Sequence, residues 1–112
     1  MLNLVSIYLE AVNPQAHHFR AYSISCGKDL LGEWLVQTTF GKIGKRGTTK
    51  SYAFPEQEKA QKHINTLLKK RFTAHKRIGC NYEIKSCEID PNASFIFPKT
   101  VNEVEIFPIS MV

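Results

Sequence analysis

The segment from Thr38 to Lys50, TTFGKIGKRGTTK, combines cations, glycines and one aromatic ring in a short stretch. Glycine lets a backbone approach a partner closely, and a group of cations attracts an anion. In a regular strand, Phe40 and Lys42 share one face. Such a pair suits nucleic acid, because the ring can stack on a base or sugar while the ammonium group meets a phosphate. The candidate binding residues in this segment are Phe40, Gly41, Lys42, Lys45, Arg46 and Lys50.

Phe40 also fits a purely structural role. Its ring could continue the face of Trp34 and Val36 into the core, because aromatic residues in strands are usually buried. If Ile43 is the buried residue instead, Phe40 and Lys42 face solvent, and a bulge earlier in the strand would be needed to separate the two faces. From the residues alone, both alternatives stay open.

The three glycines of the segment, Gly41, Gly44 and Gly47, are spaced G-x-x-G-x-x-G. This spacing matches neither the dinucleotide-binding pattern G-x-G-x-x-G nor the phosphate-binding pattern G-x-x-x-x-G-K-[ST], and no helix is expected directly after it. A flexible hairpin is therefore favoured over a nucleotide-binding loop, and we expect no cofactor.

Charge is unevenly distributed along the chain, whose formal net charge is +5. Residues 1–40 carry a net charge of −1, residues 41–77 carry +9, and residues 78–112 carry −3. A basic middle between acidic ends points first to a polyanionic partner.

Basic residues continue from the hairpin into the segment that follows it. They could form a phosphate track or simply a solvated helix face, which is the more frequent role of such charges. Lys76 and Arg77, near the end of this segment, complete the candidate DNA-binding residues. The other cations of the expected helix face are Lys59, Lys62, Lys69 and Lys70.

Metal-binding and catalytic patterns are weak. His17 and His18 are distant in sequence from the other histidines, and Cys80 and Cys87 lack the spacing of zinc ligands. No paired carboxylates, nucleophile elbow or Cys/His signature stands out. We therefore expect neither a metal site nor enzymatic activity.

The three cysteines are an odd number and form no C-x-x-C pair, which favours reduced thiols in the cytoplasm over a disulfide framework. The apolar runs are far shorter than the ~20 residues of a membrane span. The N-terminus has no basic region before its apolar residues, so we do not expect a signal peptide.

Four segments are predicted to be strands, and the first two alternate between apolar and polar residues in the manner of half-buried strands. They cover residues 4–10, 20–26, 34–43 and 48–54. Gly44 and Gly47 are expected to supply the positive φ angles of a hairpin between the last two.

Pro55 changes the period, because proline suits the first turn of a helix. Ala60, Ile64, Leu67, Leu68 and Phe72 then form one helical stripe, and Gly79 is the expected stop. The fold class predicted is α+β: an antiparallel sheet of four or more strands with one long helix packed across it.

The whole arrangement resembles the WGR domain family. The resemblance rests on DLLGEWLVQTTFGKIGKRGT followed by SYAFPEQEKAQKHINTLLKKRFTAHKRIGCNY, and the first two strands are similar to those of small bacterial members. The family is named for Trp-Gly-Arg, which Phe40-Gly41-Lys42 replaces here. It implies a WGR-like domain over residues 1–82, with residues 83–112 as an acidic extension that adds strands or wraps on the same domain.

In DNA-dependent poly(ADP-ribose) polymerases the WGR domain binds DNA ends. The resemblance therefore implies Phe40 as the ring that stacks on a terminal nucleotide and Lys42 as the matching cation, and it favours the exposed alternative for Phe40. Phenylalanine has a smaller face than tryptophan, and lysine lacks the fork of arginine. We expect weaker, electrostatic DNA binding without sequence specificity. The alternative is a protein-interaction module in which residues 83–112 bind a partner or a second copy.

Overall fold

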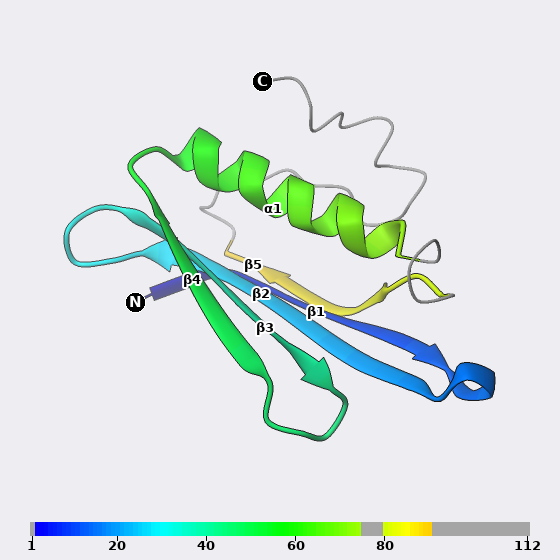
Figure 1. Ribbon diagram of the computed structural model, residues 1–112. Helices are drawn as coiled ribbons and strands as arrows, with labels where there is room; N and C mark the ends of the chain where they lie inside the picture. The colour runs from blue at the N-terminus through cyan, green and yellow to red at the C-terminus, as the bar shows by residue number, and fades with distance from the viewer. Residues whose placement is uncertain (1, 75–79, 91–112) are drawn as a thin grey trace.

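The computed structural model describes residues 2–74 and 80–90, which form a five-stranded sheet and one long helix (Figure 1). The strands run in the order β4-β3-β2-β1-β5, and every neighbouring pair is antiparallel. The predicted α+β fold is confirmed. The elements are β1 (Leu2–Asn13), η1 (Pro14–Ala16), β2 (His18–Lys28), β3 (Trp34–Lys42), β4 (Thr48–Phe54), α1 (Gln57–Phe72) and β5 (Glu83–Ile89).

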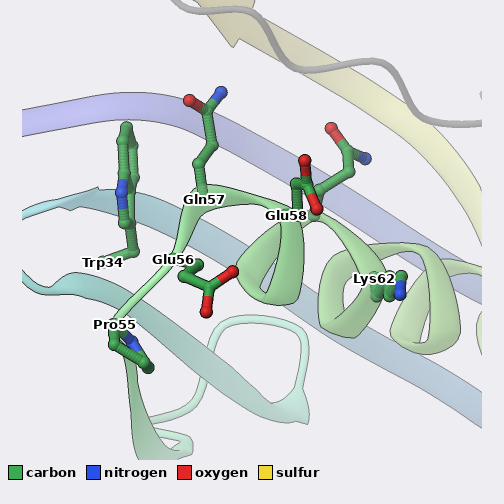
Figure 2. A pocket seen from close by; sticks show the side chains of 7 residues that line it. Trp34, Pro55, Glu56, Gln57, Glu58 and Lys62 are labelled. Carbon is green, nitrogen blue, oxygen red and sulfur yellow. The ribbon is translucent and has the colours of Figure 1, made fainter. Parts of the chain in front are cut away.

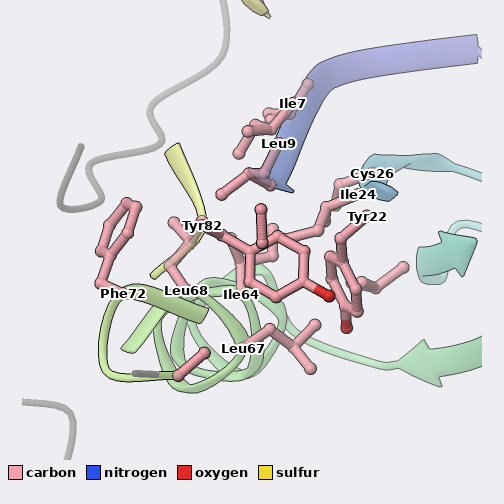
Figure 3. Packing of buried hydrophobic residues seen from close by; sticks show 14 of the residues in the cluster. Ile7, Leu9, Tyr22, Ile24, Cys26, Ile64, Leu67, Leu68, Phe72 and Tyr82 are labelled. Atoms are coloured by element: carbon pink, nitrogen blue, oxygen red, sulfur yellow. The ribbon is translucent and has the colours of Figure 1, made fainter. Parts of the chain in front are cut away.

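The core lies between α1 and one face of the sheet (Figure 3). Alternate residues of the two central strands point toward the helix and are almost completely buried, among them Ile7, Leu9 and Ile24. The predicted helical stripe is buried against them, from Ala60 to Phe72. The alternation in sequence and the burial in space therefore agree, because side chains in a strand point to opposite faces in turn.

The helix is shorter than the sequence suggested. It begins at Gln57, so that Pro55 precedes the helix instead of lying in its first turn, and it ends at Phe72, well before Gly79. At this end Thr73 has left the helical conformation, with φ −111° and ψ 20°, and the N–H of Ala74 donates to the carbonyl of Arg71 at 3.3 Å, in a tighter turn. The N–H and hydroxyl groups of Thr73 both donate to the carbonyl of Lys69, at 3.1 and 2.8 Å.

A second helix-ending contact comes from beyond the helix. The N–H of Tyr82 donates to the carbonyl of Arg71 at 3.0 Å, and the Tyr82 ring is buried in the core. After Tyr82, β5 pairs with β1 and forms an edge of the sheet. The extension expected from residue 83 thus contributes one strand, whereas residues 91–112, on which the predicted partner or self-association depends, lie outside the described residues.

The β3–β4 hairpin uses its two glycines differently from the prediction. Gly44 has the expected positive φ, at 79°, but Gly47 does not adopt one. Gly47 is required by close packing instead: a Cβ atom there would lie 2.5 Å from the carbonyl oxygen of Phe40. The hairpin backbone therefore packs directly on the end of β3.

Three cysteines are free, and Cys26 is completely buried. Burial raises the pKa of its thiol to about 11, so the thiol stays protonated at neutral pH. Within residues 2–74 and 80–90, no helix combines the length and apolar character needed to cross a membrane.

His63 links α1 to β4 through its ring. The ring lies 4.5 Å from that of Tyr52 and 5.2 Å from that of Phe54, measured between centroids. Its Nε2 atom is buried and has no hydrogen-bond partner within the described chain. Desolvation, with a smaller contribution from the charge of Lys70, lowers the pKa of His63 below its ordinary value of 6.5.

This histidine makes folding stability depend on pH. Because its pKa is lower in the folded chain, the unfolded chain binds the proton more readily, and stability falls as the pH drops through about 6.5. We predict a lower unfolding midpoint in urea at about pH 5.5 than at about pH 7.5, and a smaller difference for His63→Leu. Equal pH dependence in both proteins would assign the effect to other groups.

Gly47 supplies a steric test of the hairpin. We expect Gly47→Ala to destabilise the protein by about 1–3 kcal/mol, since the added methyl group must displace the backbone of Phe40. Urea unfolding measures this. Lys45→Ala, at an exposed position of the same turn, is the control and should change the free energy of unfolding by less than about 0.5 kcal/mol. Similar values for both variants would contradict the close packing.

Candidate nucleic-acid interface

Phe40 lies on the helix-facing side of the sheet. The pairing of β3 with β2 and with β4 is regular from Trp34 to Phe40, so Phe40 shares its face with Val36 and Thr38, both buried. Its ring packs against the hydrophobic core but remains half-buried. The expected solvent-facing orientation is therefore wrong, and the alternative is confirmed: Phe40 continues the face of Trp34 and Val36 and packs at the edge of the core.

The Phe40 ring is flanked from the two neighbouring strands. On the β2 side it stacks on Tyr22, with ring centroids 6.0 Å apart and planes inclined by 19°. On the β4 side the Lys50 ammonium nitrogen lies 5.7 Å from the centre of the ring. Tyr22 is buried and Lys50 is exposed. Phe40 is thus backed by a rigid ring on one side and covered by a movable cation on the other.

Arg71, in the last turn of α1, extends this row of rings and cations. Its guanidinium carbon lies 3.9 Å from the centre of the Tyr22 ring and 5.7 Å from that of Tyr82. Its Nε atom is buried without a hydrogen-bond partner in the described chain. Sequence reasoning missed Arg71 as a site residue because it stands within a run of basic residues. Its position could have distinguished it, because Arg71 directly precedes Phe72, a member of the predicted buried stripe, and so lies beside the core.

Together these side chains form one continuous cluster, which we call the cation–ring row. The row contains three rings and two cations, and each contact lies within the range of cation–π or aromatic interactions. The row is defined by Lys50, Phe40, Tyr22, Arg71 and Tyr82.

The hairpin beyond the row carries further cations. Lys42, Lys45 and Arg46 are all exposed, and the N–H of Lys45 donates to the carbonyl of Lys42 at 3.1 Å. Lys42 is also paired across the strands with Arg20, an exposed cation that the sequence analysis did not select. No acidic residue occurs between Trp34 and Phe54. The hairpin itself is therefore positively charged.

Gly41 belongs to the opposite face of the sheet. It lines a hollow of about 190 Å³ whose other walls include Tyr8, Thr39 and Lys45. A Cβ atom at Gly41 would lie 3.1 Å from the Cα atom of Gly47, so this position too is held by tight backbone packing. The same face carries Phe19, whose side chain is 44% exposed and whose carbonyl accepts the N–H of Ile43.

The remaining candidates lie on α1 or outside the described residues. Lys76 and Arg77 lie outside the described residues. Lys59 and Lys62 are exposed near the start of α1, whereas Lys69 and Lys70 are exposed near its end. Across residues 2–74 and 80–90, no three His, Cys, Asp or Glu side chains form a group suited to a metal ion.

Comparison with known proteins gives one positive result. No curated protein matches the chain. The profile of the WGR domain family matches residues 5–78, about two thirds of the sequence, and spans β1 through α1 with the hairpin between them. The protein therefore belongs to the WGR domain family, whose members are nucleic-acid-binding modules.

Proposed function

We propose that this protein is a non-enzymatic module that binds DNA without sequence specificity and recognises exposed DNA ends or breaks. The observation that carries the proposal is the half-buried ring of Phe40, backed by Tyr22 and bordered by exposed cations. Membership of a nucleic-acid-binding family supports the choice of a polyanion as the partner.

Phosphate contacts would come from the hairpin. Contacts from lysine or arginine to phosphates orient DNA but read no sequence, because the phosphates are the same at every base pair. Because the chain has no carboxylate between Trp34 and Phe54, no acidic residue of the hairpin itself offsets the attraction. The residues proposed to contact phosphates are Lys42, Lys45, Arg46 and Lys50.

Phe40 would provide the preference for ends. In a continuous duplex every base face is covered by its neighbour, whereas a terminus exposes one face to an aromatic ring. The exposed Lys50 side chain can move from the ring to a phosphate at small cost, and Tyr22 then supports Phe40 from behind. Half-burial thus fixes the ring while leaving an edge of it accessible.

The role of Phe40 predicts a loss of selectivity. We expect Phe40→Ala to reduce the preference for an open duplex over a closed dumbbell of the same sequence to near unity, while binding to the dumbbell persists. Fluorescence anisotropy at two salt concentrations measures both affinities. Phe19→Ala is the matched control, because Phe19 is an exposed ring at the same end on the other face.

Two outcomes would count against Phe40. An unchanged preference for ends in Phe40→Ala would remove its stacking role, and loss of the preference in Phe19→Ala alone would move the stacking contact to the other face of the sheet. Thermal unfolding of each variant checks that the fold is retained, since Phe40 packs against the core.

The hairpin cations predict a change in salt dependence. Each phosphate contact contributes about −0.9 to the slope of log K against log salt concentration, so Lys42→Ala with Arg46→Ala should make the slope less steep by up to about 1.8. The control is Lys59→Ala with Lys62→Ala, near the start of α1. If the control pair changes the slope and the hairpin pair does not, the phosphate track follows the helix instead.

A further inference from the structure

The loop between β2 and β3 is held in one conformation by its own hydrogen bonds. The Asp29 carboxylate accepts the N–H groups of Leu31 and Glu33, each at 2.9 Å, and the Asp29 N–H donates to the Glu33 carbonyl at the same distance. Gly32 adopts a φ of 83°, which only glycine takes without strain. The tip of this loop is therefore an ordered structure.

This ordered loop presents two leucines to solvent. Leu30 is 104% exposed and Leu31 is 86% exposed, relative to the reference for each residue. Neither side chain contributes to the core, so the fold itself does not require apolar residues there. Adjacent apolar side chains on a rigid support are typical of a contact surface between proteins.

A hollow of about 670 Å³ lies at the same end of the sheet, between Trp34 and the first turn of α1 (Figure 2). Trp34 directly follows the leucine loop and is paired with Phe54, the residue before Pro55. The Trp34 ring already attracts a cation, since the Lys28 ammonium nitrogen lies 5.3 Å from its centre. The hollow could accommodate a large side chain of a partner.

The charges at this end disfavour DNA and favour a cationic partner. Asp29 and Glu33 belong to the loop, and Glu56 and Glu58 line the hollow. Lys59 is 4.0 Å from Glu56, and both side chains are largely exposed. The basic hairpin lies at the opposite end of the sheet (Figure 1). Three ammonium groups lie among these carboxylates, those of Lys28, Lys59 and Lys62. The four carboxylates still outnumber them, so the net charge is negative, which disfavours phosphate groups and favours lysine or arginine.

We propose that the leucine loop and the adjacent hollow form a docking surface for a short segment of another protein. The segment carries an apolar residue, which packs on Leu30 and Leu31, next to an arginine or lysine, which enters the hollow beside Glu56 and Glu58. This surface is separate from the proposed DNA site, so both partners can be bound at once.

The test is a selection of random twelve-residue peptides displayed on phage, with the full chain as bait and Leu30→Ser/Leu31→Ser as the subtraction protein. We expect enriched peptides to combine an apolar residue with arginine or lysine. Synthetic copies should bind the full chain at least about tenfold more tightly than Leu30→Ser/Leu31→Ser or Glu56→Gln/Glu58→Gln. Lys42→Ala/Arg46→Ala is the matched control and should bind them normally.

Three results would overturn the proposal. They are a selection that enriches no peptide, a selection that enriches acidic peptides, and synthetic peptides that bind Leu30→Ser/Leu31→Ser as tightly as the unchanged protein. Light scattering adds a further check: a dimer that disappears in Leu30→Ser/Leu31→Ser would make a second copy the occupant instead. Because the substituted leucines are exposed, the serine variant should keep its unfolding temperature and its DNA affinity.

Discussion

Burial of one stripe of α1 against one face of the sheet is the interaction on which the rest of the structure depends. The helix has 16 residues and is about 24 Å long, whereas the 12 residues of β1 span about 40 Å. The sheet therefore extends beyond the helix. Aromatic residues close the core where the cover ends: Phe40 and Tyr82 near the end of α1, and Trp34 near its start.

The cation–ring row shows how charge is tolerated at the edge of this core. A guanidinium group is more weakly hydrated than an ammonium group and can lie flat on an aromatic ring. Arg71 does so on Tyr22, at 3.9 Å, which offsets part of the cost of removing its charge from water. The same contact joins the last turn of the helix to β2. A positive charge is consequently fixed in place on Tyr22, the ring on which Phe40 stacks, in addition to the flexible lysines of the hairpin.

Periodicity predicted the sheet and the helix because burial on one side leaves a repeating pattern in the chain. It could not determine the orientation of Phe40, since a period of two separates the faces of a strand without identifying which one the helix covers. The end of α1 depends on Tyr82, a residue distant in sequence from the helix turn that it contacts. Arg71 stands within a run of basic residues, and its ring partners, on β2 and directly before β5, are distant in sequence, so no local pattern reveals these contacts.

The separation of charge along the sheet affects how the molecule approaches a polyanion. At physiological ionic strength, electrostatic attraction fades over about 8 Å, a small fraction of the length of β1. An approaching strand of phosphates therefore interacts with one end of the protein at a time. The hairpin end is drawn in while the carboxylates near Trp34 remain beyond the range of repulsion. The long axis of the sheet thus acts as a spacer that gives the encounter a preferred orientation.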